Sequence, residues 1–293
     1  MGIYRFFEND TPIIMKKHIS SLFSLLFASL SLNYVSAVPK NNSEPAAADP
    51  YEVTMAIEKT MPRVIAHRGY WKTPGSAQNS ITSLAKADSI GAFGSEFDVW
   101  LTADDALVVN HDRVFKGVNF PEATAAEVAE IRLDNGETVP TLSEYLEAAK
   151  HFTRPRLILE VKTFGNDSLR QTLACEKIVN MVDASGLRDR VDYIAFSLFA
   201  CKELHRLSPD RPVYYLNGDL SPKEIKDLGF AGIDYSYKTL EKHPEWIDEA
   251  KREGLEVNVW TVDDPAIMDD MLLKKVDYIT TNLPELLQSK LSH

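Results

Sequence analysis

The sequence has little cysteine and little positive charge. Only Cys175 and Cys201 occur among its 293 residues, and both lie in stretches with helical spacing. An exported location permits a disulfide between them, but the pattern favours two buried thiols. The formal net charge is −11, which argues against a nucleic acid or an anionic membrane as a partner held by bulk electrostatics. A phosphate-bearing substrate therefore needs a local cluster of cations or a metal ion.

The chain also lacks a long uninterrupted apolar run. The apolar stretch near the N-terminus is too short and too rich in serine to predict a membrane span. It starts at Met15 with two lysines and ends at a small-residue cleavage site at Ala37, the three zones of a secretory signal peptide. We interpret residues 1–37 as an N-terminal extension plus signal peptide, with an uncleaved anchor as the alternative. This predicts an exported protein, periplasmic or secreted, with no stable membrane insertion after cleavage.

Residues 38–60 are rich in proline, alanine and asparagine, and predict a flexible leader that ends in a short helix. Residues 61–293 alternate short apolar runs with longer amphipathic stretches. The apolar runs are RVIAH, SEFDVWL, RLILEVK, VDYIAFS, PVYYLNG, AGIDYSY, EVNVWTV and DYITTN. Eight such strand-then-helix units predict a single α/β domain, a (β/α)8 TIM barrel.

One further apolar run, ALVVNHD at residues 106–112, breaks this alternation. We interpret it as a small excursion after the second strand that pairs locally and does not join the barrel. A doubly wound open sheet is the alternative architecture. No glycine-rich nucleotide fingerprint follows the first strand, which argues against the dinucleotide-binding form of that fold.

Acidic side chains gather at the ends of the predicted second and third barrel strands, where barrel active sites lie. Glu96 and Asp98 are two residues apart, so both face the same side of an extended strand. Glu160 and Lys162 repeat this spacing in the next barrel strand. Neighbouring inward carboxylates repel one another unless a cation lies between them. Glu96, Asp98 and Glu160 therefore suit one hard divalent cation, Ca²⁺ or Mg²⁺, better than zinc.

A structural layer of salt bridges, with Arg68 and Lys162 neutralising the acids, is the alternative. Two histidines beside the acids favour the metal site. His67 ends the first strand in His-Arg-Gly, and His111 ends the excursion in His-Asp. With unperturbed pKa values near ~6.5, such a pair is suited to acid and base catalysis at neutral pH. Asp112 can either orient a ring or cap the following turn.

Trp260 lies near the end of the seventh strand, where its indole can either wall a pocket or fill the barrel core. The pattern leaves both open. The acidic residues that follow, Asp263-Asp264 and Asp269-Asp270, are interpreted as a helix N-cap and a solvated face. They do not predict a second metal site.

The order of these motifs resembles the glycerophosphodiester phosphodiesterase family. The likeness extends from residue 63 to about residue 287 and includes H-R-G, E-x-D, H-D, L-E-V-K and V-W-T-V. Members of that family are (β/α)8 barrels that use a divalent cation to hydrolyse glycerophosphodiesters to glycerol 3-phosphate and an alcohol. The resemblance therefore implies a small glycerophosphodiester substrate.

Carried over by position, the resemblance assigns roles to eight side chains. The acid/base pair is His67 and His111, and the phosphate contacts are Arg68 and Lys162. The aromatic residue of the pocket is Trp260. The metal ligands are Glu96, Asp98 and Glu160. The family usually continues after H-R-G into a Pro-Glu-Asn-Thr-like turn, but here the stretch is GSAQNS, with Gln78 in place of the glutamate. If that glutamate supports the metal, metal preference and substrate choice differ in this chain.

Two other functions stay open at this point. One is a phospholipase-type phosphodiesterase of the same barrel architecture that acts on intact lipids. The other is a non-catalytic protein that binds phosphodiesters outside the cytoplasm, since a fold alone does not guarantee activity. Retention of both histidines and all three acids argues against the second.

Overall fold

Eight parallel strands close into a barrel in the computed structural model, which describes residues 61–163 and 165–292. The strands are β1 (Arg63–Ala66), β2 (Gly94–Leu101), β6 (Arg156–Val161), β7 (Val191–Ala195), β8 (Val213–Tyr215), β9 (Gly232–Ser236), β10 (Glu256–Trp260) and β11 (Tyr278–Thr281). The barrel closes because β1 pairs with both β2 and β11. This confirms the predicted (β/α)8 fold. The predicted signal peptide and leader lie outside the described residues.

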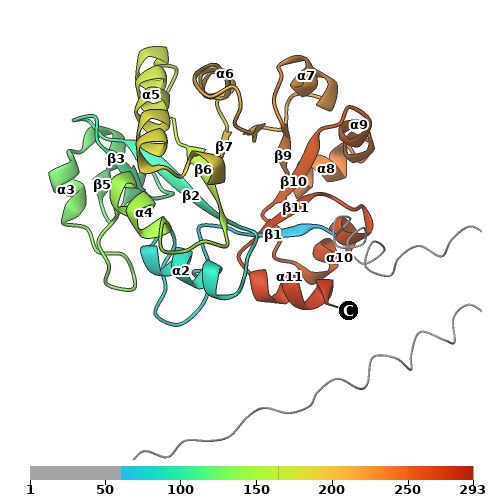
Figure 1. The fold of residues 1–293 in the computed structure, drawn as a ribbon, viewed down its shortest axis with the longest axis horizontal. Helices are drawn as coiled ribbons and strands as arrows, with labels where there is room; N and C mark the ends of the chain where they lie inside the picture. The colour runs from blue at the N-terminus through green and yellow to red at the C-terminus, as the bar shows by residue number, and fades with distance from the viewer. Residues whose placement is uncertain (1–60, 164, 293) are drawn as a thin grey trace, which may run out of the picture. The chain divides into compact units, whose positions relative to one another are not determined.

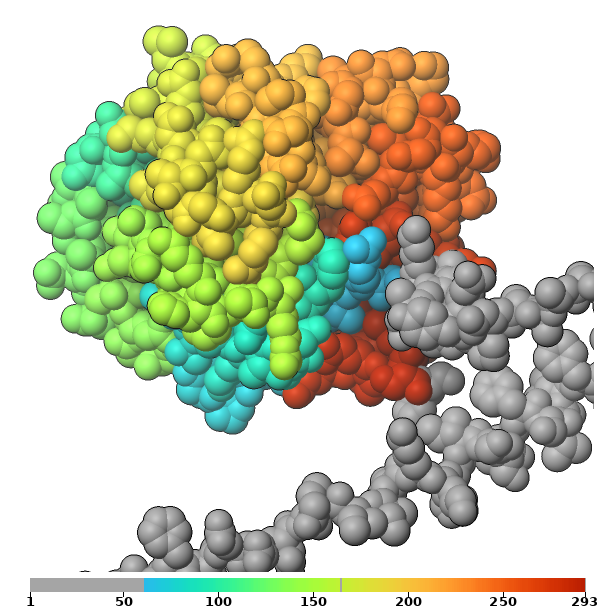
Figure 2. Space-filling model, viewed as in Figure 1, coloured from blue at the N-terminus to red at the C-terminus, as the bar shows by residue number. Residues whose placement is uncertain are grey.

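The barrel segments follow one another around the molecule in chain order, from blue through green and yellow to red (Figure 2). Helices surround the strands (Figure 1). Their bounds are α2 (Ile81–Ser89), α4 (Leu142–Ala149), α5 (Ser168–Ser185), α6 (Leu198–Leu207), α7 (Pro222–Asp227), α8 (Tyr237–Lys242), α9 (Trp246–Arg252), α10 (Pro265–Leu273) and α11 (Pro284–Leu291). Within the part of the chain that the structure describes, no helix has the length and apolarity to span a bilayer.

The strands alternate between two environments, as the period of two in a strand requires. Residues such as Phe97 and Leu159 point outward and pack with the helices in the main core. Their neighbours point into the barrel, where Ile158 and Ile194 fill the middle. Polar residues that alternate with outward apolar ones therefore reach the barrel interior. This alternation sets the site on the inner face.

The excursion after β2 is larger than the sequence predicted. As expected, β3 (Leu107–Val109) pairs locally, antiparallel to the end of β2. A hairpin follows, formed by β4 (Val114–Phe115) and β5 (Val118–Asn119), and then η1 (Phe120–Glu122) and α3 (Ala125–Ala129). These elements share a small core of their own around Trp100 and Phe120. The sequence pattern missed it because its elements are only two to five residues long.

Cys175 and Cys201 are both buried and free, as predicted. Their thiols approach backbone carbonyls, that of Cys175 the carbonyl of Ala200 and that of Cys201 the carbonyls of Ala195 and Tyr214. They pack as small apolar side chains between α5, α6 and the barrel.

Candidate active site

The C-terminal ends of the strands enclose a cavity of about 100 Å³. Seven of the eight predicted site residues line it: His67, Arg68, Glu96, His111, Glu160, Lys162 and Trp260. The eighth, Asp98, is buried directly behind them, with its Oδ1 2.9 Å from Nζ of Lys162. The structure thus brings together every residue that the sequence singled out, although the residues come from five different strand ends or loops.

Glu96, Asp98 and Glu160 form one buried acidic cluster. Their ligand oxygens all lie within 4.8 Å of one another. The parallel register of β2 and β6 places Asp98 directly opposite Glu160, and Glu96 lies two residues before Asp98 on the same inner face. The spacing within β2 and its pairing with β6 therefore bring the three carboxylates close together.

The acidic cluster carries more negative charge than its protein neighbours neutralise. Burial, with repulsion from Asp98 and Glu160, raises the pKa of Glu96 well above its usual range. Burial also raises the pKa of Glu160 to about 8, against the opposing charge of Lys162. Burial acts on Asp98 in the same direction, but Lys162 and other donors hold its pKa well below the usual range. Two of the three carboxylates thus lack sufficient positive charge nearby.

One oxygen of the cluster has no partner. Oε2 of Glu96 accepts a hydrogen bond from the backbone N–H of Arg68 at 2.7 Å, but its buried Oε1 has no hydrogen-bond partner among the described residues. A buried orphan oxygen within a carboxylate cluster is unusual in native proteins. Hard oxygen ligands of this kind suit Ca²⁺ or Mg²⁺, so the residues present fit a divalent cation.

The predicted salt-bridge layer is also present, but only in part. Nζ of Lys162 lies 2.9 Å from Oδ1 of Asp98 and 2.6 Å from Oε1 of Glu160. Nε of Arg68 lies 4.0 Å from Oδ2 of Asp98. No Lys or Arg nitrogen of the described residues forms an ion pair with Glu96. The two cations therefore pair with Asp98 and Glu160, and the charge of Glu96 is left to be neutralised by another positive charge.

Gln78, the departure from the family pattern, lies beside Arg68. Its Oε1 accepts a hydrogen bond from the guanidinium of Arg68. A neutral amide thus orients Arg68 without the negative charge that a glutamate would add here. The substitution leaves more of the arginine's charge available to an anion in the cavity.

Asn79 is a site residue to which the sequence analysis gave no role. Its side chain is fully buried, and its Nδ2 donates to Oδ2 of Asp98 at 2.8 Å. Its Oδ1 accepts from the backbone N–H of Asp98 at 3.1 Å. This double contact fixes the carboxylate that faces Lys162. Its place directly after Gln78, in the turn that follows His-Arg-Gly, was the available signal.

The ring of His67 is held in one orientation by Asn282. Nδ1 of His67 lies 2.9 Å from Oδ1 of Asn282, which also accepts from the indole N–H of Trp71 at 2.8 Å. Nδ2 of Asn282 donates to Oδ2 of Asp263 at 2.8 Å. Because Asp263 accepts and Trp71 donates, the amide orientation is fixed, and Nδ1 of His67 must carry the proton. Nε2 is then the free basic atom.

The sequence pattern predicts that Asp263 and Asp264 belong to a helix N-cap. Asp264 does cap α10, accepting from the N–H groups of Ala266 and Ile267. Asp263 instead accepts from both the backbone N–H and the side chain of Asn282. The pairing spans the β10 and β11 ends and could not be read from local sequence.

His111 lies on the other side of the cavity and is more open, with 35% of its side chain exposed. Its Nδ1 is 2.7 Å from Oδ1 of Asp112, so Asp112 contacts the ring. Burial lowers the pKa of His111, and Lys162 and Arg68 act in the same direction, while Asp98 and Asp112 oppose them. The two histidines thus differ in partner: His67 has a neutral amide and His111 a carboxylate.

The wall opposite the charged groups is mostly apolar. It consists of Ile194, Phe196, Leu216 and Trp260, with Asp234 among them. The indole N–H of Trp260 donates to the backbone carbonyl of Asp234 at 2.8 Å, and its ring meets Phe196 edge-on at 5.5 Å. The indole lines the cavity and also packs against the inner apolar cluster of the barrel.

Gly69 allows the chain to turn tightly beneath this site. Its φ is +73°, and an added Cβ would lie 2.3 Å from Oγ and 2.8 Å from the carbonyl carbon of Ser83. We expect Gly69→Ala to lower the free energy of unfolding by at least ~2 kcal/mol, because left-handed strain and a backbone clash add. Thermal unfolding should show this as a lower Tm.

Gly75→Ala is the matched control for that substitution. Gly75 has a φ of +75° but nothing within 4 Å of an added Cβ, so only the left-handed strain of about 1 kcal/mol remains. Equal losses in the two variants would show that the close approach to Ser83 has no energetic consequence.

Comparison with known proteins shows which family this chain resembles. The model of the glycerophosphoryl diester phosphodiesterase family matches residues 67–286. A crystal structure of a glycerophosphodiester phosphodiesterase from Parabacteroides distasonis is 52% identical, with a TM-score of 0.78, and the match covers 79% of this chain and 97% of that one. A glycerophosphodiester phosphodiesterase from Caldanaerobacter subterraneus is 27% identical over 245 residues, covering 76% of this chain and 95% of the relative.

A more distant structural neighbour carries a ligand. It is an Oleispira antarctica phosphodiesterase in complex with the product sn-glycerol-3-phosphate, 23% identical, with a TM-score of 0.68. The match covers 81% of this chain and 99% of that chain. At this identity the likeness is one of fold.

Proposed function

The chain belongs to the glycerophosphoryl diester phosphodiesterase family, and we propose that it hydrolyses glycerophosphodiesters to glycerol 3-phosphate and an alcohol by metal-dependent acid/base catalysis. The observation that carries the proposal is the cavity itself. It sets a buried acidic cluster with an orphan oxygen between two histidines with different partners. Two cations, Arg68 and Lys162, lie in the same cavity.

Glu96, Asp98 and Glu160 would hold one divalent cation, Ca²⁺ or Mg²⁺. Such an ion supplies positive charge to the phosphoryl oxygens of the substrate. Arg68 and Lys162 add charge at the same place and orient the phosphate, since preorganised cations stabilise the charge that develops in the transition state. Gln78 keeps the Arg68 guanidinium turned toward the cavity.

His67 is assigned as the base. Its Nδ1–H is engaged by Asn282, and burial with the charge of Arg68 lowers its pKa to about 4. The ring is therefore neutral near pH 7, with Nε2 free to take a proton from the nucleophile. The nucleophile is water or the adjacent glycerol hydroxyl, which would give a cyclic phosphate first.

His111 is assigned as the acid. Burial lowers its pKa, while the carboxylates of Asp98 and Asp112 favour its protonated form. Its ring is partly exposed, which leaves a departing alcohol a way out. As the nucleophile's oxygen bonds to phosphorus, the bond from phosphorus to the alcohol oxygen breaks, and His111 gives that oxygen its proton. The proton taken by His67 and the one given by His111 balance the step. Where the glycerol hydroxyl is the nucleophile, water would open the cyclic phosphate in a second step, in which His111 takes a proton from water and His67 returns one to the glycerol oxygen.

Asn282→Ala tests the positioning of His67. We expect kcat to fall about 10- to 100-fold with little change in KM, the effect seen when a partner that orients a catalytic ring is lost. Kinetics on glycerophosphocholine would measure it. Asn135→Ala is the control, because the amide of Asn135 bonds Glu137 and the backbone of Gly75, outside the residues that line the cavity. A kcat within ~2-fold of wild type would remove Asn282 from the mechanism.

The direct test of the proposed function uses the predicted mature chain, residues 38–293. Glycerol 3-phosphate release would be measured from glycerophosphocholine and glycerophosphoethanolamine, first with EDTA and then with Ca²⁺ or Mg²⁺ restored. Metal-dependent release supports the proposal. No release with any metal, from folded protein, rejects it and favours the binding-protein alternative.

A second substrate class has a specific observation in its favour. Phe196 and Phe199, at the turn from β7 into α6, are 42% and 40% exposed, and Phe196 lines the cavity. Exposed aromatic rings beside a site offer apolar contact to a lipid chain. Intact lysophospholipids are therefore the next substrates to test, as the phospholipase-type alternative requires.

We also propose that the protein is exported, from the signal-peptide pattern of residues 1–37. N-terminal sequencing of the protein recovered from the periplasm or the medium would test this. A mature start at Val38 supports export. Recovery of the full chain from the cytoplasm rejects it.

A further inference from the structure

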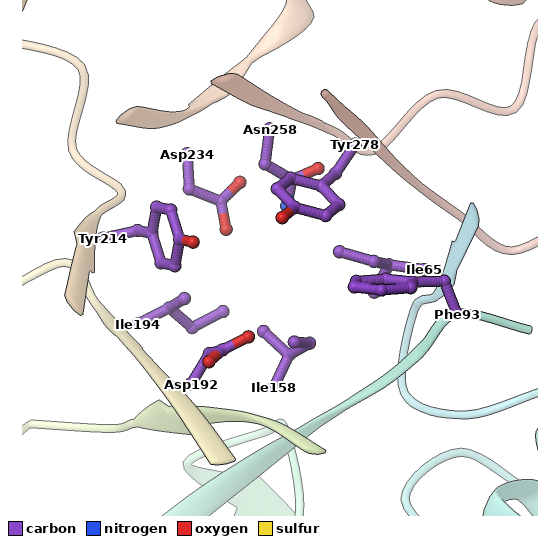
Figure 3. Close-up of a pocket in the computed structure, with 9 residues that line it drawn as sticks. All are labelled: Ile65, Phe93, Ile158, Asp192, Ile194, Tyr214, Asp234, Asn258 and Tyr278. Carbon is purple, nitrogen blue, oxygen red and sulfur yellow. The ribbon is translucent and has the colours of Figure 1, made fainter. Parts of the chain in front are cut away.

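Two cavities lie one above the other inside the barrel, and they share Asp234. The upper one is the candidate active site. The lower one, shown in Figure 3, is lined by aromatic and aliphatic side chains together with Asp192, Asp234 and Asn258, and measures about 10 Å³. That is room for about one water molecule and for nothing larger. Any ligand that reaches Asp234 must therefore come from the catalytic cavity above.

The carboxyl group of Asp234 is buried without a full set of partners. Asp234 is 2% exposed and projects inward from β9, beside its cross-strand neighbour Asn258 on β10, as Figure 3 shows. Its Oδ1 has no hydrogen-bond partner among the described residues. The side-chain amide of Asn258 bonds mainly to Thr280, with Nδ2 donating to Oγ1 at 2.9 Å. Buried polar atoms in proteins nearly always have a partner, so this oxygen lacks one that the chain does not supply.

Asp234 also lines the catalytic cavity, so a ligand bound there can supply the missing partner. The charged groups of the catalytic cavity lie on one wall, and the opposite wall is built from Ile194, Leu216 and Trp260. Asp234 and two threonines, Thr261 and Thr280, are the polar residues of that second wall. A substrate whose phosphate meets the charged wall places its carbon chain along the apolar one. A hydroxyl group on that chain would meet Asp234.

The inner location favours the glycerol half of the substrate over the leaving alcohol. His111, the proposed acid, must lie next to the leaving oxygen, and its ring is partly exposed at the opening. The leaving alcohol therefore points outward. The other ester half, glycerol, points into the enclosed space of about 100 Å³.

We propose that Asp234 binds a hydroxyl group of the glycerol moiety and so selects glycerol diesters over other phosphodiesters. This inference rests on the proposed function. Asp234 is a binding and specificity residue here and takes no part in proton transfer to the reacting atoms.

The protonation behaviour of Asp234 is compatible with this role. Burial raises the pKa of Asp234 to about 7, while a hydrogen bond with Asn258 acts in the opposite direction. Near neutral pH both forms are present. The carboxylate accepts a hydrogen bond from a hydroxyl group, and the carboxylic acid can also donate one.

The test compares two substrates that differ only in the hydroxyl groups. Glycerophosphocholine carries two, and propylphosphocholine has the same three-carbon chain and head group with none. Choline release reports both. For Asp234→Ala we expect kcat/KM on glycerophosphocholine to fall about 10- to 100-fold, the size of one hydrogen bond to a charged group. The value on propylphosphocholine should change less than ~3-fold.

Two additions separate binding from folding and from chemistry. Asp234→Leu keeps the approximate size of the side chain but removes both oxygens, and it should show the same substrate-dependent loss if Asp234→Ala does not fold. Tyr214→Phe is the control, because Tyr214 lines only the lower cavity; its kcat/KM ratio for the two substrates should match wild type. Calorimetry with glycerol 3-phosphate and propyl phosphate should show weaker binding in the Asp234 variants for the first ligand alone.

If the wild type hydrolyses glycerophosphocholine but not propylphosphocholine, as a glycerol-hydroxyl nucleophile requires, the calorimetry decides: weaker binding of glycerol 3-phosphate alone by the Asp234 variants supports the inference, and equal or no weakening for both ligands overturns it. The kinetic outcomes are otherwise distinct. Loss on glycerophosphocholine alone supports the inference. Equal loss on both substrates, or none on either, overturns it and gives Asp234 a structural role. A wild-type enzyme that hydrolyses both substrates equally also overturns it. A wild-type protein that hydrolyses neither rejects the proposed function itself.

Discussion

Replacing His67 with glutamine is expected to lower kcat on glycerophosphocholine by about 10³-fold, within the range of one general acid or base. Nε2 is the free basic atom of the His67 ring, because Nδ1 is engaged by Asn282. Glutamine fills similar space but cannot take a proton at neutral pH. His111→Gln should cause a loss of the same order. Steady-state release of glycerol 3-phosphate, with saturating metal, measures both.

The control for these variants is His151→Gln, because His151 is exposed and lies after α4, outside the cavity. Its kcat should equal that of wild type. Circular dichroism and the Tm of each variant separate a chemical loss from unfolding. Near-normal turnover by both His67→Gln and His111→Gln would contradict the acid/base assignment.

The pH dependence of kcat/KM tests which histidine is the base and which is the acid. A base must be unprotonated, so kcat/KM falls as pH drops through the pKa of His67, which burial and Arg68 lower to about 4. The acid limb should therefore lie well below the ~6.5 of an ordinary histidine. The alkaline limb belongs to His111, which must be protonated. Because burial lowers the pKa of His111, this limb should also lie below ~6.5. An acid limb near 6.5 that persists in His67→Gln would contradict this assignment.

The barrel and the grouping of the candidate catalytic residues could be predicted from sequence because both depend on short patterns along the strands and on the strand order. Glu96 and Asp98 share a face through the period of two in a strand, and the parallel register then sets Asp98 opposite Glu160. The eight strand-helix units fixed the order in which strand ends meet. Nothing more was needed to place the acids together.

The residues that orient the candidate catalytic residues were out of reach for a different reason. His67 and Asn282 are 215 residues apart, and Asp263 contacts Asn282 across two strand ends. Asparagine and aspartate in such loops equally favour turns and caps, so their composition points to no single role. Asp234 was hidden because an acid in the middle of an apolar run reveals neither its burial nor its missing partner.

Removing the metal should abolish activity, with a loss of at least ~10³-fold in EDTA, because the charge on the phosphoryl oxygens then loses a stabilising contribution of several kcal/mol. Ca²⁺ or Mg²⁺ should restore it. Glu96→Gln should produce a similar loss that no metal restores. Glu130→Gln, at an exposed position outside the cavity, is the control.

Stability gives this prediction a readout that is independent of turnover. The pKa of Glu96 is raised well above its usual range by burial and by its two acidic neighbours, and that of Glu160 is raised to about 8. A raised folded-state pKa means that the metal-free protein is stabilised by protonation. That stability is fully present below the unfolded pKa of about 4.5 and is lost as pH rises through the folded value.

The metal-free wild type should therefore have a lower Tm at pH 8 than at pH 6, and added Ca²⁺ or Mg²⁺ should raise the Tm because it binds only the folded state. Glu96→Gln removes one buried charge. Its metal-free Tm at pH 8 should equal or exceed that of wild type, while its response to metal should disappear. A metal-induced rise of equal size in wild type and Glu96→Gln would place the cation elsewhere. The acidic cluster would then be a salt-bridge layer, with Lys162 as its counter-ion and the orphan oxygen of Glu96 unexplained.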